Sequence, residues 1–344
     1  MNRMGVQLQD FCFAADENYS MPLTVCIGSL IWSVRRCRRE MRIHVLDLGI
    51  DDATWQKMVE KWTELVARIG HDEKGEICFV RHKTSKSLFA GMMSWHGSVA
   101  TYARLLLPKL LPDINWCLYS DGDVLFVESP FVLDEQCMDS DVYILGHKNP
   151  PEADAVDGKW FRDNKLPFNE KQYVCAGFLL MNLAFFRLHA LSDSALDFLR
   201  SYKTTASADQ CAINYVCSDS LHVLPNRWGI FSGEIGDIVD GGGAIHYADG
   251  VPWRVPVNGT ALFGGYQAIS ELWRRFAIEI MGVSAEELHF SFKAMFGVRI
   301  RSLIVRMYLI ASRVFRFSAG RYKSYAGKYT RKSAVEKYKE LLFS

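Results

Sequence analysis

The sequence contains no Cys-x-x-Cys pair and no window of 18 residues free of charged side chains. Its nine cysteines are scattered along 344 residues, which argues against both a disulfide framework and a zinc knuckle. Residues 1–19 lack the continuous apolar region and the small-residue cleavage site of a secretory signal. We therefore expect a globular protein of a reducing cytosol that neither spans a membrane nor is exported by that route.

Net charge is nearly absent overall, but it is unevenly distributed. The formal net charge is +1, yet residues 291–344 hold thirteen Lys and Arg against two Glu. This segment therefore carries +11 and residues 1–290 carry −10. An acidic body without a recognition motif argues against nucleic acid as a partner.

Strand-like and helix-like apolar patterns alternate along residues 10–127. Strands are expected at 10–16, 41–49, 76–82 and 115–127, and helices at 23–34, 51–70 and 98–111, the last disturbed at Pro108. Repeated units of this kind predict an α/β fold with a mostly parallel central sheet flanked by helices. The 49% hydrophobic content supports a sizeable core.

Two aspartates interrupt the expected strand at residues 115–127. In an extended chain Asp121 and Asp123 would point to the same side, while Gly122 would leave the opposite side empty. Two carboxylates at the carboxyl end of a strand suit Mg²⁺ or Mn²⁺. An isolated Asp-x-Asp is also common in solvated turns and helix caps, so the motif alone leaves both interpretations open.

Seven ordered segments favour the metal site over the turn. They are FAADENY (13–19), IHVLDLGI (43–50), TYARLLLPKLLP (101–112), LYSDGDVLF (118–126), AGFLLMNL (176–183), ADQCAIN (208–214) and IHYADGVPW (245–253). The set resembles family 8 glycosyltransferases over residues 10–255, in particular bacterial enzymes that build lipopolysaccharide or lipooligosaccharide. The resemblance implies the Rossmann-like GT-A fold and a retaining, Mn²⁺- or Mg²⁺-dependent transfer of galactose or glucose from a UDP-hexose to a saccharide acceptor.

The resemblance also implies roles for individual residues of the nucleotide and metal sites. The residues that match the uridine and ribose segment are Ala14, Ala15, Asp16 and Asn18. The residues that match the metal set are Asp121 and Asp123, with Gly122 between them, and His246. For residues 14–18 the alternative is an ordinary βα turn without a bound nucleotide. For His246 the alternative is an ordinary core or surface histidine without a metal ion.

Three further residues match the donor-sugar side of the family's site. Arg104 matches an arginine near the donor phosphate or sugar, although an arginine on an apolar helix is usually a surface residue. Asp209 matches the acid that binds donor-sugar hydroxyls, and Gln210 matches the amide near the anomeric carbon. Retention would follow from a double displacement or from same-face attack, and the sequence does not decide between the two.

The chain departs from the family pattern at two places. Cys175 stands where the family usually has an asparagine that contacts the donor sugar, and Val251 precedes Pro252 where the family has a phosphate-binding lysine. Arg254 either supplies the lost charge or is a surface residue. These departures keep two alternatives open: a nucleotide-sugar binding or scaffold protein with impaired turnover, and a UDP-sugar hydrolase.

We expect three regions: a catalytic domain (1–255), a helical connector (256–290) and a basic amphipathic tail (291–344). In residues 292–317 of the tail, large apolar side chains interleave with Arg299, Arg301, Arg306, Arg313 and Arg316. Such a segment can lie on an anionic membrane surface. It would then hold the enzyme on the inner face of the plasma membrane, near a glycolipid acceptor. The alternative is a helix packed on the domain with a solvated cationic face, and the sequence leaves the oligomeric state open.

Overall fold

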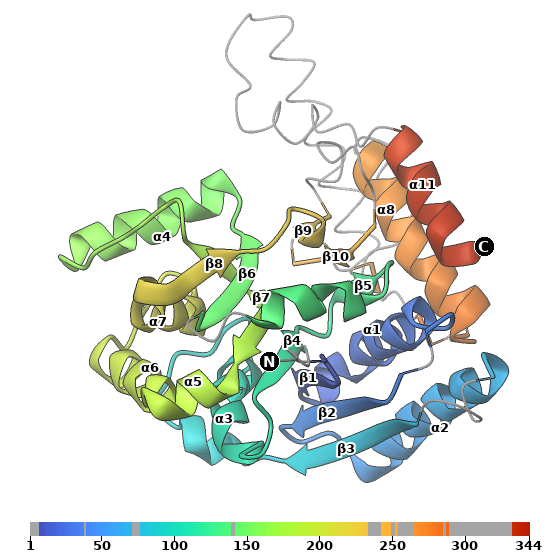
Figure 1. Ribbon diagram of the computed structural model, residues 1–344, viewed down its shortest axis with the longest axis horizontal. Coiled ribbons are helices and arrows are strands. Elements are labelled where there is room, and N and C mark those ends of the chain that lie inside the picture. Colours follow the sequence, from blue (N-terminus) through green and yellow to red (C-terminus); the bar gives the residue numbers. More distant parts are fainter. Residues whose placement is uncertain are drawn as a thin grey trace, which may run out of the picture.

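The computed structural model describes residues 7–37, 39–70, 76–138, 142–232, 242–248, 252–253, 264–284, 287–288 and 332–344. The strands are Asp10–Ala15 (β1), Met41–Asp47 (β2), Ile77–Lys83 (β3), Trp116–Ser120 (β4), Val124–Phe126 (β5), Ile144–Lys148 (β6), Val174–Asn182 (β7), Leu221–Val223 (β8), Trp228–Phe231 (β9) and Ala244–His246 (β10). Helices flank these strands on both sides (Figure 1).

The α-helices are Ser20–Ser33 (α1), Asp52–Arg68 (α2), Leu107–Leu110 (α3), Pro151–Asp163 (α4), Leu183–Leu188 (α5), Leu191–Ser201 (α6), Ala208–Val216 (α7), Gly264–Arg275 (α8) and Lys332–Phe343 (α11). The 3₁₀ turns are Glu17–Tyr19 (η1), Lys86–Phe89 (η3), Ala100–Leu106 (η4), Pro130–Met138 (η5) and Ser218–Ser220 (η6), and a π-helical turn, Phe276–Ile280 (η9), continues α8. Within these described ranges, every helix is too short or too polar to cross a bilayer.

The described strands form one large sheet and one small sheet. The large sheet has seven strands in the order β3-β2-β1-β4-β7-β6-β8, and the small sheet has the order β5-β10-β9. In the large sheet β7 runs antiparallel to both of its neighbours, and every other pairing is parallel. The expected α/β fold with a mostly parallel sheet is confirmed.

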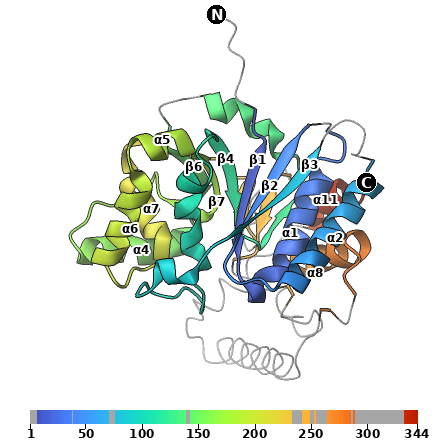
Figure 2. The same ribbon diagram turned by 90° about the horizontal axis from the view of Figure 1, so that it is seen from below.

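Helices cover the two faces of the large sheet in two groups. Figure 2 shows α1, α2, α8 and α11 on one side of the sheet and α4, α5, α6 and α7 on the other. Each group closes its own hydrophobic core against the sheet. The helix expected at residues 51–70, α2, shows why such a helix forms and packs on the sheet. The Asp51 side chain caps its first turn, and Met58, Trp62 and Leu65 form its buried face.

The strand expected at residues 115–127 is divided in two. Strand β4 belongs to the large sheet and β5 to the small one, and the chain turns at residues 121–123 between them. The prediction of one continuous strand through both aspartates was therefore wrong. An Asp-Gly-Asp sequence disfavours a central strand and favours a turn, so the two acids lie at the junction of the two sheets.

The helix expected at residues 98–111 is also shorter and less regular than the pattern suggested. It consists of the 3₁₀ turn η4 followed by the single turn α3, with Pro108 in the first turn of α3. Proline lacks an amide hydrogen, and its ring would clash with the carbonyl of Arg104 in a continuous α-helix. The helix therefore starts again at Leu107, and Arg104 ends up in a 3₁₀ segment.

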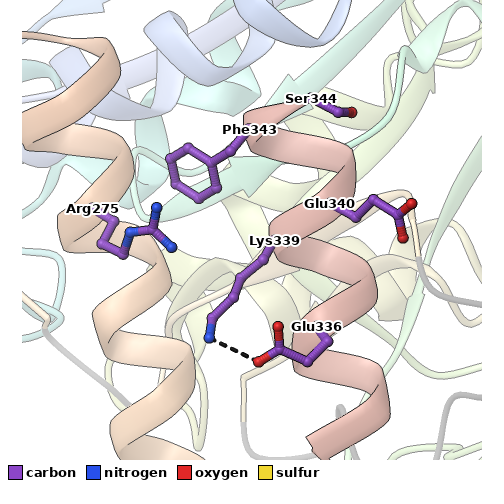
Figure 3. Close-up of a pocket in the computed structure, with 6 residues that line it drawn as sticks. All are labelled: Arg275, Glu336, Lys339, Glu340, Phe343 and Ser344. Carbon is purple, nitrogen blue, oxygen red and sulfur yellow. Dashed lines mark hydrogen bonds and ion pairs between the residues drawn. The ribbon is translucent and has the colours of Figure 1, made fainter.

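The C-terminal helix α11 packs against the body of the protein. Tyr338 and Leu342 are buried, and the indole of Trp32 in α1 donates to the carbonyl of Leu342 at 2.6 Å. The Arg275 guanidinium of α8 lies 4.3 Å from the centre of the Phe343 ring. Figure 3 shows the shallow pocket between α8 and α11, whose remaining lining residues are Glu336, Lys339, Glu340 and Ser344. The last helix of the predicted tail is therefore packed on the body of the protein, as the alternative to membrane attachment had it. Residues 291–331 of the tail lie outside the described part of the chain.

The docking of α11 predicts that truncating its buried face destabilises the whole protein. Leu342→Ala should lower the free energy of unfolding by about 2–4 kcal/mol, since it leaves a cavity under the helix. Tyr338→Phe is the matched control, because it keeps the buried ring and removes a hydroxyl that has no described hydrogen-bond partner. Urea denaturation followed by circular dichroism measures both. Equal stability of Leu342→Ala and the native chain would contradict the docking.

Candidate active site

Three predicted metal ligands come together at the junction of the two sheets. One ligand atom each from Asp121, Asp123 and His246 lies within 4.8 Å of the other two. Asp123 and His246 are buried, and His246 Nε2 lies 3.2 Å from Asp123 Oδ1. The antiparallel pairing of β5 with β10 places His246 opposite Val124, next to Asp123. The convergence therefore depends on the turn at 121–123 and on this pairing, and the expected alternation along one strand does not produce it.

The surroundings of these three residues suit a divalent metal ion. Asp123 Oδ1 is fully buried, and its one partner among the described residues is His246 Nε2 at 3.2 Å. A Cβ atom on Gly177 of β7 would come within 2.3 Å of His246 Cε1 and 2.9 Å of Asp121 Oδ2, so glycine keeps this space open. Two carboxylates with an imidazole form a mixed donor set that favours Mn²⁺ over Mg²⁺, because Mg²⁺ prefers oxygen ligands alone.

Asp123 and His246 shift each other's proton affinity. Burial acts to raise the pKa of the Asp123 carboxyl, but the charge of His246 and hydrogen bonds from His246 and Tyr19 outweigh it and leave the pKa below its ordinary value. Burial acts to lower the pKa of His246, but Asp123 outweighs it and raises this pKa well above its ordinary value. A proton and a metal ion therefore compete for the His246 imidazole, and acid should weaken metal binding.

Two tyrosine hydroxyls orient the metal carboxylates. Tyr19 donates to Asp123 Oδ2 at 2.9 Å, and Tyr119 donates to Asp121 Oδ1 at 2.9 Å. The sequence analysis identified neither residue. For Tyr119 a signal was present, because it stands two residues before Asp121 and so shares its side of the extended chain. For Tyr19 there was none, since its contact joins residues 104 positions apart.

Arg104 is buried beneath the metal cluster and is only 2% exposed, so the surface alternative for this residue is excluded. Its Nη2 lies 2.9 Å from Asp121 Oδ1 and its Nε lies 3.0 Å from Asp209 Oδ2. It also donates to the carbonyl of Ala176. Burial acts to lower the pKa of Arg104, but Asp121 and Asp209 outweigh it and raise the pKa further above its ordinary value. The guanidinium thus links a predicted metal ligand, Asp121, to the aspartate of the Asp-Gln pair.

The Asp-Gln pair lies in the first turn of α7. Burial raises the pKa of Asp209, although the Arg104 charge and a hydrogen bond from the Thr101 hydroxyl act in the opposite direction. The Gln210 side chain is held at both ends. Its Oε1 accepts from the backbone amide of Ala176 at 3.0 Å, and its Nε2 donates to Asp157 Oδ2 at 2.9 Å. Asp157, which the sequence did not single out, therefore belongs to the same network.

The predicted nucleotide segment comprises the last two residues of β1 and the start of the turn that follows it. Asp16 accepts from the Ser98 hydroxyl at 2.8 Å and from the backbone amide of Asn18 at 3.1 Å, so it fixes the start of η1. Asn18 itself is exposed. The side chains of Ala14 and Ala15 belong to the two hydrophobic cores, which leaves the backbone as the part of these residues that a nucleotide can contact.

Cys175 lies directly behind the metal cluster. Its Sγ is 3.9 Å from His246 Nδ1 and accepts from the backbone amide of Gly177 at 3.4 Å. The space beside Gly122 was expected to be empty, and this was wrong. A Cβ there would meet Leu23 and Tyr19 at 3.3 Å, so glycine allows α1 and η1 to approach the turn closely. Val251 and Arg254 lie outside the described residues.

Comparison with known proteins identifies the family. The model of glycosyl transferase family 8 matches residues 11–236, about two thirds of the chain. The chain belongs to glycosyltransferase family 8. No curated protein matches this family 8 chain significantly by sequence.

Solved structures support the GT-A fold of this family 8 glycosyltransferase. The galactosyltransferase LgtC, in complex with donor and acceptor sugar analogues, is 23% identical with a TM-score of 0.60, over 80% of this chain and 96% of LgtC. The bifunctional glycosyltransferase WbbM is 16% identical with a TM-score of 0.61, over 86% of this chain and 53% of WbbM. GlyE of Streptococcus pneumoniae TIGR4 is 16% identical with a TM-score of 0.54, over 84% and 66% of the two chains.

The open space at Gly177 predicts that one added methyl group weakens metal binding by this family 8 glycosyltransferase. Gly177→Ala should weaken Mn²⁺ binding by at least about 10- to 100-fold, because the new Cβ displaces His246 and Asp121 from a common centre. Isothermal titration calorimetry and the rise in melting temperature with added Mn²⁺ measure this. Gly146→Ala is the control, since its Cβ would crowd Val174 and Leu179 at 2.8–2.9 Å, outside the cluster. Native Mn²⁺ affinity in Gly177→Ala would contradict the assigned site.

Proposed function

We propose that this glycosyltransferase is a metal-dependent, retaining enzyme that transfers galactose or glucose from a UDP-hexose to a saccharide of a bacterial surface glycolipid or polysaccharide. The observation that carries the proposal is the joint placement of Asp121, Asp123 and His246 with the Asp209–Gln210 pair around Arg104. The fold it shares with a galactosyltransferase solved with donor and acceptor sugar analogues supports the same function.

The residues of the chain divide between the two halves of a nucleotide sugar. Asp121, Asp123 and His246 would hold Mn²⁺ or Mg²⁺, and such an ion supplies a Lewis acid that stabilises negative charge on the departing UDP. Tyr19 and Tyr119 hold the two carboxylates in orientation. Asp209 and Gln210 would contact the sugar, and Arg104, Thr101 and Ala176 already hold these two side chains in place. Such prior positioning lowers the cost of reaching the transition state.

Release of UDP from a panel of UDP-sugars tests the proposal. The native chain should release UDP from UDP-galactose or UDP-glucose with Mn²⁺ and not with EDTA. Asp123→Ala should lower kcat/KM by about a thousandfold, because the ion contributes several kcal/mol to the transition state. Asp113→Ala, an exposed carboxylate ahead of β4, should leave kcat/KM unchanged.

Three outcomes of that assay distinguish the candidate functions. An α-linked product from an α-linked donor, identified by NMR with a saccharide acceptor, would establish retaining transfer. Free sugar as the sole product, with acceptors present, would favour a hydrolase. Metal-dependent UDP binding without release from any donor, also with acceptors present, would contradict the transferase proposal and favour a scaffold protein.

We also propose that the basic segment attaches the enzyme to an anionic membrane at the cytoplasmic face. The charge of residues 291–344 supports this, since each cation near an anionic surface adds about 1 kcal/mol to binding. Because α11 packs on the body, the test should keep it and alter only the preceding residues. Replacing Arg299, Arg301, Arg306, Arg313 and Arg316 with Gln should abolish co-sedimentation with phosphatidylglycerol vesicles. Unchanged co-sedimentation of this variant would refute the attachment.

A further inference from the structure

Asp157, in the middle of α4, is a carboxylate with 0% exposure. Its oxygens accept from the Ser207 hydroxyl at 2.6 Å and from Gln210 Nε2 at 2.9 Å. Among the residues the structure describes, no Lys or Arg forms an ion pair with it. A buried carboxylate without a cationic partner is costly, so these two hydrogen bonds must compensate for its desolvation.

An ionised carboxylate differs from the other side chains that could fill this position. It accepts hydrogen bonds and donates none, so both neighbours must point a hydrogen toward it. The Ser207 hydroxyl can rotate to do so at little cost. For the Gln210 amide the requirement is stricter, because its oxygen and nitrogen have nearly the same shape and can exchange places by rotation of the amide group.

The opposite end of the Gln210 amide meets a donor. The backbone amide of Ala176 donates to Gln210 Oε1 at 3.0 Å. If the amide turned over, its oxygen would face the Asp157 carboxylate and its nitrogen would face the Ala176 N–H. Both contacts would be repulsive, and Asp157 Oδ2 and the Ala176 N–H would each lose the hydrogen bond they make with Gln210. Only one orientation of Gln210 is therefore compatible with its surroundings.

We propose that Asp157 is the positioning residue that fixes the orientation of the Gln210 amide. The Gln210 amide is connected to the predicted metal cluster through Ala176. The Ala176 amide donates to Gln210, its carbonyl accepts from Arg104, and the next residue is Gly177, which borders His246 and Asp121. The role assigned to the oriented amide rests on the proposed function, whereas the contact itself does not. Asp157 touches none of the metal ligands and acts only through Gln210.

Asp157→Asn tests this role with almost no change in shape. An asparagine can donate or accept toward Gln210, so both orientations of the Gln210 amide become possible. We expect kcat for UDP release to fall at least about tenfold, because a catalytic group is then misplaced in part of the molecules. KM for the donor and Kd for UDP with Mn²⁺ should stay within about twofold of the native values, since the hydrogen bonds of Asp157 go to Ser207 and Gln210 and to none of the predicted metal ligands.

Asp154→Asn is the matched control. Asp154 lies three residues earlier in α4, is 2% exposed and bonds Lys148, with no bond to Gln210. It therefore measures how far the loss of a buried carboxylate from this helix lowers kcat by itself. A purely structural role for Asp157 predicts equal effects of the two substitutions on kcat and on melting temperature, and this result would overturn the proposal.

A double-mutant cycle tests the contact without turnover. Gln210→Glu places two carboxylates face to face and should lower the melting temperature. Adding Asp157→Asn restores a donor, because the asparagine amide introduced in α4 can donate to the new glutamate. The double variant should then lose at least about 2 °C less than the sum of the two single losses. Additive losses would overturn the proposed contact. If the native chain releases UDP from no donor, the proposed function fails and this cycle alone decides whether Asp157 orients Gln210.

Discussion

The buried guanidinium of Arg104 is the constraint on which the rest of the site depends. It is paired with Asp121 at the metal cluster and with Asp209 in the Asp-Gln pair. Removing one partner of a buried ion pair leaves an unbalanced charge, which costs more than the pair contributes. The predicted metal ligands and the Asp-Gln pair are therefore linked through one side chain. The irregular segment around Pro108 supports this arrangement, since it places Arg104 in a short 3₁₀ turn.

The backbone of β7 joins the same two halves a second time. The carbonyl of Ala176 accepts from Arg104, and its amide donates to Gln210. The next residue, Gly177, leaves the space into which His246 and Asp121 project, and its carbonyl accepts from the amide of Asp121. Two consecutive residues in a buried central strand thus fix the positions of groups from η4, α7 and β10 and from the turn between β4 and β5. A strand is well suited to this role, because its hydrogen bonds to β4 and β6 hold its backbone rigidly.

Apolar periodicity and capping residues predicted the early elements well and the junction of the sheets poorly. The sequence at 51–70 contains both the capping residue and the apolar face of the helix, so α2 lies within two residues of the expected range at each end. The break between β4 and β5 was missed because the apolar residues on both sides of Asp121 resemble one strand. The neighbourhood of His246 and Asp123 depends on pairing between β5 and β10, which joins residues more than a hundred positions apart. The family resemblance supplied this contact where periodicity could not. Nothing in the sequence indicated a role for Asp157, because a single aspartate in a helix is common. Only the structure shows that it lies beside Gln210.

The charges of the site explain why the residue at position 251 matters. Asp121, Asp123 and Asp209 bring three negative charges, and Arg104 balances one of them. A divalent ion that displaces the proton from His246 would balance the other two and leave the cluster neutral. A diphosphate in this site, as the proposed function requires, would bring negative charges that the cluster does not compensate, and burying them without further cations is costly. The family's lysine would meet this need, and the chain has Val251 at that position in the sequence. Among the described residues, Lys86 lies 3.9 Å from Asp16 of the predicted nucleotide segment, and its side chain is 54% exposed. If such an exposed cation compensates the diphosphate, salt screens it more strongly than a buried lysine, and the affinity for UDP should depend on ionic strength more than the affinity for the metal ion does.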